Sequence, residues 1–497
     1  MTTQIEHIFV LMLENRSFDH MFGLSHMTGT DAATGGQTII EGLSGHETNT
    51  FNGNACSVLP PGADYVMPVD PSHEFPSVLD QLCGSSARYT GGGPYPPMDN
   101  SGFVDSYVRS GGSANPAEIM KCFDTIRQLP VLFTLAKEFA LCDHWYSSLP
   151  GPTWPNRLFA HAASSSGLDH SPTTAEIIKW ETINGFSFPK GSIYDRLKAA
   201  KIPYHFYAGD DFPMIASLQG IDLWDIHGYD DLQKDLKKET FPYRYVFIEP
   251  SYNTLHEFRN SSCEHPLADV RDGEQLIKDV YEWIRASTAW AKSMLIITWD
   301  EHGGFYDHVR PPPAKPPGDT RPGSEHNQYG FTFAQYGVRV PAIVASPWIP
   351  RNLVDHRVYD HASIPATVEK LFGLAPLTAR DAAANTLLDL ASENSPRMSP
   401  DYLPDAPLKP KFAAAALTGP NAMIGTGPVS VTRPEDSANG GSLPNVINSA
   451  LRLDLMMNPG NHAQILASVA KISTREDAMR YLQVVQQQLR ATRQTAP

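Results

Sequence analysis

The sequence predicts an α/β domain with a mostly parallel central sheet, on the basis of three observations. Short apolar runs have the length and composition of strands that are buried on both faces. Amphipathic segments with helical spacing lie between these runs. Polar clusters directly follow two of the runs, where open α/β sheets usually hold their ligands. The predicted strands are 8–13, 245–248, 294–299 and 343–345, with 204–207 as a weaker candidate.

Helices are predicted for two segments of this domain and for the tail. Segment 275–286 carries its large apolar residues on one side, and segment 363–372 ends before a glycine. Ser473 with Glu476 has the spacing of a capping box, which predicts a final helix continuing through Leu489.

The chain is predicted to contain one large catalytic domain over residues 1–400, followed by a tail. Residues 30–125 are rich in Gly, Pro, Ser and Asn and predict a long loop insertion near the functional site. Residues 401–497 are expected to form a linker or wrapped arm and then the C-terminal helix. We expect this tail to pack on the core.

Composition excludes several classes of protein. The 497 residues are 41% hydrophobic, which excludes wholesale disorder. The 39 Lys and Arg against 54 Asp and Glu give a net charge of −15, so no nucleic-acid partner is expected. The same charge disfavours anionic lipid surfaces and leaves zwitterionic lipids open. No apolar run reaches the roughly 20 residues of a membrane helix.

The N-terminal stretch and the cysteines bear on localisation. The first residues lack the basic flank and cleavage site of a secretory signal, so a cytoplasmic location is expected, with export by another route left open. The five scattered cysteines form no CxxC zinc pattern and favour a reducing compartment. A single bridge between Cys56 and Cys83 stays open.

Two polar clusters carry candidate metal ligands. Glu14 and Asn15 follow the strand 8–13, and their oxygens suit a hard divalent cation; a helix N-cap is the alternative. Asp300 and Glu301 follow the strand 294–299. Adjacent carboxylates repel each other unless a positive group lies between them, so a cation is expected here; an acidic turn in solvent is the alternative.

A third cluster offers a nucleophile. Pro150, Gly151 and Pro152 stiffen a turn that presents the hydroxyl of Thr153. A metal that lowers the pKa of such a hydroxyl makes it a nucleophile, and Arg157 could neutralise a phosphoryl oxygen. A purely structural turn is the alternative. The sequence contains no HExxH, GxSxG, Walker A or dinucleotide fingerprint.

These phrases together resemble a known family. The segments ENRSFDHMFG, LPGPTWPNR and DEHGGFYDHV are similar to those of the phosphoesterase family of bacterial and plant phospholipases C and an acid phosphatase, and with smaller landmarks they span about residues 5–375. The resemblance implies an alkaline-phosphatase-like α/β/α sandwich. Threonine at the nucleophile position is the phospholipase variant, whereas the acid phosphatase has serine there.

The resemblance also assigns roles to residues. It implies one divalent metal ion, with Ca, Zn, Mg and Mn left open. Thr153 would be the nucleophile, and His73 or His265 would protonate the leaving group. The expected metal ligands are Glu14, Asn15, Thr153, Asp300 and Glu301, and the expected substrate-binding residues are Asn15, Arg157, His302, His308 and His361.

The function expected from these residues is metal-dependent phosphoester hydrolysis of the phospholipase C type through a phosphothreonine on Thr153. The expected partner is a phosphoester, with a zwitterionic phospholipid as one candidate. An acid phosphatase acting on monoesters at the same site is the alternative. A non-catalytic metal-stabilised scaffold is a third hypothesis, which the presence of the Thr153 hydroxyl disfavours. Oligomeric state is not predicted.

Overall fold

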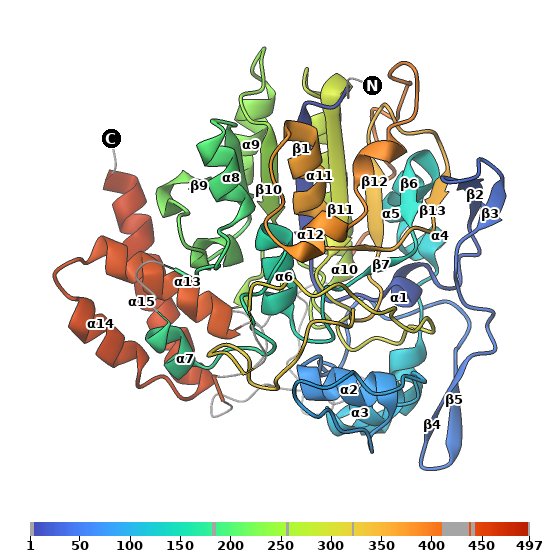
Figure 1. The fold of residues 1–497 in the computed structure, drawn as a ribbon, viewed down its shortest axis with the longest axis horizontal. Helices are drawn as coiled ribbons and strands as arrows, with labels where there is room; N and C mark the ends of the chain where they lie inside the picture. Colours follow the sequence, from blue (N-terminus) through green and yellow to red (C-terminus); the bar gives the residue numbers. More distant parts are fainter. Residues whose placement is uncertain are drawn as a thin grey trace, which may run out of the picture.

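A ten-stranded sheet runs through the centre of the computed structural model, in the order β3-β2-β13-β6-β12-β11-β1-β10-β8-β9 (Figure 1). The structure describes residues 4–180, 185–254, 258–320, 323–409, 437–438 and 443–495. Its strands are β1 (His7–Leu13), β2 (Thr28–Asp31), β3 (Gln37–Ile39), β6 (Ala140–Cys142), β8 (Tyr204–Ala208), β9 (Ile226–His227), β10 (Tyr245–Glu249), β11 (Ser293–Trp299), β12 (Ala342–Ala345) and β13 (Leu353–Asp355).

The predicted strands are all present, but one of them runs in the opposite direction. β1 pairs in parallel with β10 and β11, and both β1 and β11 are buried along their whole length. β12, predicted as a parallel strand, is antiparallel to both β11 and β6. Its apolar run predicted its burial correctly, but burial on both faces does not specify strand direction.

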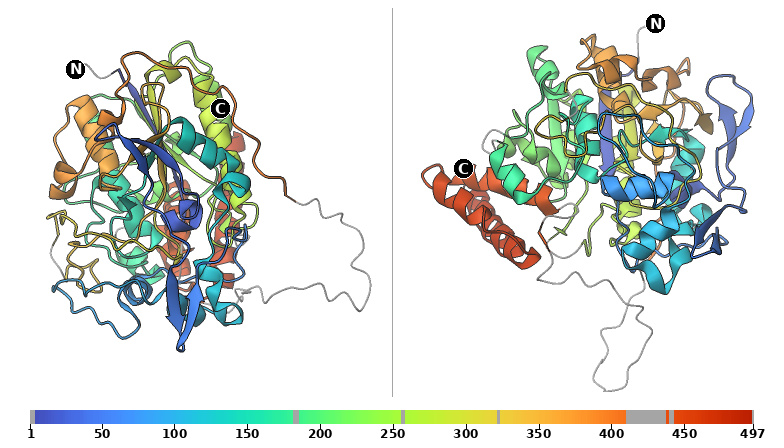
Figure 2. Two further views of the ribbon diagram at one scale, coloured as in Figure 1. Left: turned by 90° about the vertical axis from the view of Figure 1, so that its right-hand side faces the viewer. Right: turned by 60° about the horizontal axis from the view of Figure 1, so that its bottom comes forward.

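Helices cover both faces of the sheet, so the predicted α/β/α sandwich is confirmed. Figure 2 shows α11 on one side of the strands and α10 on the other. Helices α5 and α10 pack together, as do α6, α8 and α11. The helices that surround the sheet are α1 (Phe18–Phe22), α4 (Thr125–Gln128), α5 (Pro130–Glu138), α6 (Thr153–Ala162), α7 (Thr174–Lys179), α8 (Ile193–Ala199), α9 (Tyr229–Leu236), α10 (Val270–Arg285), α11 (Ser363–Phe372) and α12 (Ala379–Ala383).

The region 30–125 has more regular structure than its composition predicted. It holds a separate hairpin and two helices that lie beyond the carboxyl ends of the central strands (Figure 1). These helices bury Val78, Leu82, Phe103 and Val104 in a small core of their own. The elements are β4 (Thr48–Phe51), β5 (Asn54–Ser57), α2 (Phe75–Cys83) and α3 (Phe103–Arg109), and another two-stranded sheet joins β7 (Trp145–Tyr146) to β14 (Tyr359–Asp360).

The tail ends in three helices instead of one, and they pack beside α7 at one flank of the domain (Figure 1). They are α13 (Leu443–Met457), α14 (His462–Val469) and α15 (Arg475–Thr495). The expected capping box is shifted by one residue, because Thr474 and Asp477 exchange the reciprocal hydrogen bonds. Most of the predicted linker, 410–436, lies outside the described residues. The five cysteines form no disulfide, which excludes a Cys56–Cys83 bridge here.

Candidate active site

The register of two central strands brings the first two predicted clusters together. Leu13 of β1 is paired with Trp299 of β11, so Glu14 and Asp300 leave the sheet side by side at its carboxyl edge. The Asp300 amide donates to the Leu13 carbonyl at 3.2 Å and extends this pairing by one residue. Segments almost 300 residues apart are therefore joined by ordinary parallel pairing.

Asn15 links the two acidic clusters to the nucleophile. Its backbone has a φ of 61°, a left-handed conformation that asparagine tolerates better than most residues. Its amide donates to Asp300 Oδ1 at 3.1 Å. The Thr153 hydroxyl donates to Asn15 Oδ1 at 3.4 Å, and Asn15 Nδ2 lies 3.3 Å from His73 Nε2. One asparagine thus contacts residues from three other segments.

Thr153 is the first residue of α6, and Pro152 holds the extended backbone before it. One turn along the helix, Arg157 donates from Nε to Asp300 Oδ2 at 2.8 Å and from Nη2 to the carbonyls of Met12 and Leu13. Its side chain is 1% exposed. Nε and Nη2 of the guanidinium are thus bonded to the ends of the strands, whereas Nη1 is buried and has no hydrogen-bond partner among the described residues.

Two glycines allow the loop after β11 to approach Asn15 closely. Gly303 has a φ of 64°, and a Cβ there would lie 2.3 Å from the Asn15 carbonyl oxygen. Gly304 has a φ of 74°, and its Cβ would meet Pro71 at 2.7 Å. Larger residues at either position would displace the segment that carries Glu301 from the segments of Asn15 and His73.

The acidic groups of this site are crowded and buried. Burial and the neighbouring Asp300 raise the pKa of Glu14 to about 8. Burial likewise raises the pKa of Asp300 to about 7, although Arg157 opposes this effect. Burial also disfavours the charged form of Glu301, but His73 outweighs it and lowers the pKa of that carboxyl. The site therefore crowds carboxyl groups whose charged forms its own cations only partly stabilise.

Two features of these residues fit a divalent cation: their crowded carboxyl groups, and one carboxylate oxygen that has no hydrogen-bond partner among the described residues. Glu301 Oε1 is buried and accepts no hydrogen bond within the described part of the chain, and the His73 Nε2 atom lies 4.0 Å away. The Glu14, Asp300 and Glu301 oxygens are, however, more widely spaced than a compact ligand set. Among the described residues, two groups have three ligand atoms within 4.8 Å of one another: Asp19, Asp307 and His308, and Asp143, His144 and His356.

The two histidines assigned to acid catalysis differ in charge. Burial disfavours charge on His73, but Glu301 and Asp70 outweigh it and raise its pKa to about 9. His265 lies against His73, with ring centroids 6.3 Å apart, and stacks on Phe258. Burial and the positive field of His73 lower the pKa of His265 well below its usual value. Of the two, only His73 has surroundings that raise its pKa, and a raised pKa favours the protonated form that a general acid needs.

His302 contacts the Glu301 carboxylate, and His361 contacts the Asp300 backbone carbonyl. His302 Nδ1 lies 3.3 Å from Glu301 Oε2, and its Nε2 lies 2.8 Å from Gln81 Oε1. His361 accepts from the Trp145 indole, so its Nε2 donates to the Asp300 carbonyl at 2.5 Å. Both rings are buried. These contacts fix the ends of β11 and favour orienting roles.

His308 does not join this group. Its Nδ1 lies 2.6 Å from Asp19 Oδ2, and Arg339 bridges Asp19 and Asp307 with two contacts of 2.9 Å. The resemblance to the phosphoesterase family placed His308 among the expected substrate-binding residues. The turn at Gly303 and Gly304 redirects the chain, so His308 lies in a second buried cluster.

Sequence reasoning missed the side chains that support the site. Asp70 lies 3.7 Å from His265 Nε2, and burial raises its pKa to about 6. Gln81 and Trp145 hold His302 and His361. Asp70 had a signal, since it belongs to the same short segment as His73. Gln81 lies on a helix with no site pattern, so nothing in the sequence marks it.

A cavity of about 530 Å³ adjoins His73. Its lining includes Asp70, Glu74, His170 and Tyr329. His73 is the one proposed catalytic residue that lines this cavity, whereas Asn15, Thr153 and Glu301 are buried behind it. Among the helices that the structure describes, none combines the length and the hydropathy needed to cross a membrane.

Fold and site together define a hydrolase of the phosphoesterase class, with a hydroxyl and an acidic cluster at the carboxyl edge of an α/β sheet. The chain belongs to the phosphoesterase family, whose model matches residues 5–375. It is 36% identical over 436 residues to non-specific phospholipase C6 of Arabidopsis thaliana, covering 83% of this chain and 78% of that protein. It is 29% identical to phospholipase C B of Mycobacterium tuberculosis, covering 85% and 84% of the two chains.

Solved structures give a looser match. A protein of the alkaline phosphatase superfamily from Vibrio parahaemolyticus is 13% identical and covers 52% of this chain and 65% of its own, with a TM-score of 0.34. The lipoteichoic acid synthase LtaP from Listeria monocytogenes is 10% identical and covers 55% and 71%, with a TM-score of 0.32.

Proposed function

We propose that this chain is a phospholipase C-type phosphodiesterase that uses the Thr153 hydroxyl as its nucleophile. The observation that carries the proposal is the hydrogen bond from Thr153 to Asn15, which is itself bonded to Asp300. These contacts join the helix of the hydroxyl to the ends of both central strands. Phospholipases C from Arabidopsis thaliana and Mycobacterium tuberculosis, which align over most of this chain, support the choice of substrate class.

The reaction proposed is an in-line displacement at phosphorus in two steps. The Thr153 hydroxyl gives up its proton to solvent and its oxygen forms a bond to phosphorus, while the bond to the leaving alcohol breaks and that oxygen takes a proton. Water then attacks the phosphothreonine, the bond between phosphorus and the Thr153 oxygen breaks, that oxygen takes a proton back, and the phosphorylated headgroup is released. The first turn of α6 fixes the hydroxyl, and the Asn15 side-chain amide can donate to a phosphoryl oxygen.

His73 is the proposed general acid. Its Nδ1 donates to the Pro71 carbonyl at 3.0 Å, which leaves Nε2 directed toward Asn15 and Glu301. A protonated Nε2 there can give its proton to the leaving oxygen. His265, whose Nδ1 accepts from the Leu267 amide, stays neutral and supports the ring of His73 from the side.

A divalent cation is proposed to bind the oxygens of Glu14, Asn15, Thr153, Asp300 and Glu301. It would lower the pKa of the threonine hydroxyl and neutralise the phosphoryl charge. The raised pKa values of Glu14 and Asp300 and the unused Oε1 of Glu301 support this assignment. An all-oxygen ligand set suits Ca²⁺, Mg²⁺ or Mn²⁺, and Zn²⁺ also accepts carboxylates.

The cavity next to His73 supports a substrate with a cationic headgroup. Asp70 and Glu74 bring carboxylates to its wall, and Tyr329 brings an aromatic ring. A quaternary ammonium group is attracted by both kinds of group. A zwitterionic phospholipid such as phosphatidylcholine is therefore the proposed substrate.

The nucleophile is tested with Thr153→Ala and a Thr153→Ser control. The alanine variant should lose at least about 10⁴-fold in kcat while keeping its circular dichroism spectrum, because the displacement has no substitute oxygen. Serine retains the hydroxyl and should keep measurable turnover. Activity of the alanine variant near the wild-type level would contradict the proposal.

The substrate class is tested with three compounds: short-chain phosphatidylcholine, a chromogenic phosphocholine diester and a chromogenic phosphate monoester. We expect kcat/KM to be highest for the phospholipid and lowest for the monoester. The reverse order would identify an acid phosphatase that uses the same Thr153, and Thr153→Ala would then abolish monoester hydrolysis instead.

A further inference from the structure

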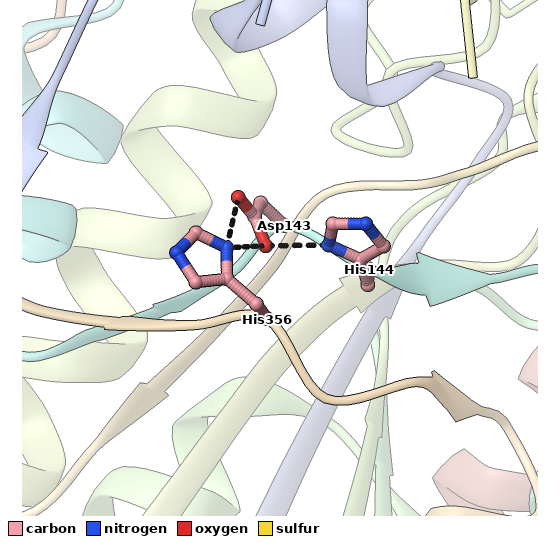
Figure 3. A group of neighbouring side chains, drawn as sticks. All are labelled: Asp143, His144 and His356. Carbon is pink, nitrogen blue, oxygen red and sulfur yellow. Dashed lines mark hydrogen bonds and ion pairs between the residues drawn. The ribbon is translucent and has the colours of Figure 1, made fainter. Parts of the chain in front are cut away.

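A second ligand set lies at the same edge of the sheet, at the ends of another pair of parallel strands. Cys142 of β6 is paired with Asp355 of β13, so Asp143 and His356 leave these strands side by side. His144 follows Asp143 directly. Figure 3 shows the two imidazoles on either side of the Asp143 carboxylate.

The three side chains bring one ligand atom each to within 4.8 Å of the others. His144 Nδ1 lies 2.8 Å from Asp143 Oδ1, and His356 Nδ1 lies 2.9 Å from both carboxylate oxygens (Figure 3). The remaining contact of this carboxylate among the described residues comes from the Glu41 amide, at 2.7 Å from Oδ2. No Lys or Arg of the described chain forms an ion pair with it.

A second observation favours a metal over a simple hydrogen-bonded triad. His356 Nε2, on the far side of its ring, lies 2.8 Å from Thr38 Oγ1 and 3.7 Å from Asp31 Oδ2. Histidines that bind metals typically donate their other ring nitrogen to such an oxygen, which fixes the ring and makes it more basic. The side chains of His144 and His356 are 22% and 29% exposed, so an ion and a water ligand can reach them.

We propose that Asp143, His144 and His356 form a binding site for a late first-row divalent cation such as Zn²⁺. The ligands are one carboxylate oxygen and the two Nδ1 atoms, with a fourth position open to solvent. On binding, each Nδ1 loses its hydrogen, and each imidazole carries its proton on Nε2. The present contacts of 2.8–2.9 Å then open to the roughly 3.3 Å between ligand atoms of a tetrahedral zinc site.

This site is separate from the proposed active site in chemistry. Two imidazoles select late metals such as Zn²⁺, Co²⁺ or Cu²⁺, whereas the ligands around Thr153 are all oxygens and suit harder cations. A metal here would join the ends of β6 and β13 and, through Thr38 and Asp31, the β2–β3 hairpin. Its expected role is to hold the edge of the sheet, and it does not rest on the proposed phosphodiesterase reaction.

Co²⁺ is the probe that separates the two sites. Tetrahedral Co²⁺ with nitrogen ligands absorbs visible light strongly, whereas octahedral all-oxygen Co²⁺ absorbs weakly. The chelator-treated full chain is titrated with Co²⁺ and then with Zn²⁺ as competitor. We expect an intense visible band that saturates at one Co²⁺ per chain and that Zn²⁺ abolishes.

Single substitutions assign the band. His144→Gln and His356→Gln each remove one nitrogen and should reduce the band at least tenfold, whereas His46→Gln, at an exposed histidine elsewhere, should leave it unchanged. Phosphoesterase activity of His356→Gln should stay within twofold of wild type. A wild-type chain without the band, or a His356→Gln variant that keeps it, would overturn the proposal.

Discussion

Two buried clusters of acidic residues, built from the same two stretches of sequence, have opposite electrostatic character. Residues 14–20 contribute Glu14 to one cluster and Asp19 to the other, and residues 300–308 contribute Asp300 with Glu301 to one and Asp307 to the other. In the second cluster Arg339 binds both carboxylates at 2.9 Å. In the first, Arg157 donates to one carboxylate, that of Asp300.

This difference supports a structural role for the Asp19 cluster and the proposed reactive role for the cluster around Glu14. The Asp19 cluster has an Arg and a His for its two carboxylates, so its charges are nearly balanced within the protein. The cluster around Glu14 has three carboxylates, and two of them have raised pKa values. Folding thus disfavours the charged forms of these carboxyls, which a cation would stabilise, and such perturbed pKa values are typical of functional sites.

The largest expected effect comes from Glu14→Gln. We expect kcat to fall by about 10³, roughly 4 kcal/mol of transition-state stabilisation, because the variant removes a proposed metal ligand. The chelator-treated variant should unfold in urea at the same or a higher concentration than wild type at pH 8, since one crowded carboxylate is gone. A loss of stability without a loss of activity would contradict the assignment.

Asp19→Asn should show the converse. One oxygen of Asp19 accepts from Arg339, and the other accepts from the amide and the ring of His308. In the asparagine variant an NH2 group would face the two His308 donors, and the buried Arg339 would lose one of the negative charges that pair with it. We expect a loss of about 3 kcal/mol in the free energy of unfolding, measured in urea. Substrate affinity of the folded protein should not change, and an unchanged stability would show that the pairing is not structural.

His73→Gln tests the proposed general acid by comparing two substrates whose leaving groups differ in their need for a proton. If His73 protonates the leaving alcohol, hydrolysis of phosphatidylcholine should fall by about 10²-fold. Hydrolysis of p-nitrophenyl phosphocholine should fall much less, because p-nitrophenolate leaves without a proton. An equal loss on both substrates would show that His73 binds the phosphoryl group and does not act as the acid.

The sequence was enough to predict the strands of the sheet. It also predicted that residues 14–15 and 300–301 come together near Thr153. Runs such as Ile8–Leu13 and Met294–Trp299 are apolar throughout, so their burial and the polar residues after them could be read directly. The direction of β12 could not be predicted, because a strand that is buried on both faces has the same residue pattern whether its neighbours are parallel or antiparallel.

Other features depend on tertiary contacts that leave no local pattern. The hairpin β4–β5 is short and polar, so no hydrophobic alternation marks it in the sequence. The resemblance placed His308 at the substrate, but the two glycines between Glu301 and His308 turn the chain toward Asp19. Arg157 matched a phosphoryl ligand by residue type, and only the structure shows its guanidinium bonded to Asp300 and two strand carbonyls.

The smallest effect expected is the pH dependence that His308 gives to stability. Burial disfavours its charge, but the hydrogen bond and charge of Asp19 outweigh it and raise the pKa of His308 to about 9. The unfolded value is about 6.5, so the folded state holds the extra proton between these two pH values. The stabilisation is therefore complete below pH 6.5 and is lost as the pH rises through 9.

His308→Asn isolates this contribution, because the asparagine nitrogen can take the place of Nδ1 without the charge. The difference in unfolding free energy between wild type and variant should be about 2 kcal/mol larger at pH 6 than at pH 9.5. Burial raises the pKa of Asp307 to about 6 and the charge of His308 lowers it, so the difference at pH 6 includes the response of Asp307 to the loss of that charge. A difference that is the same at both pH values would show that His308 is neutral in the folded protein. Charge balance would then come from Arg339 alone, and the contrast between the two clusters would be correspondingly weaker.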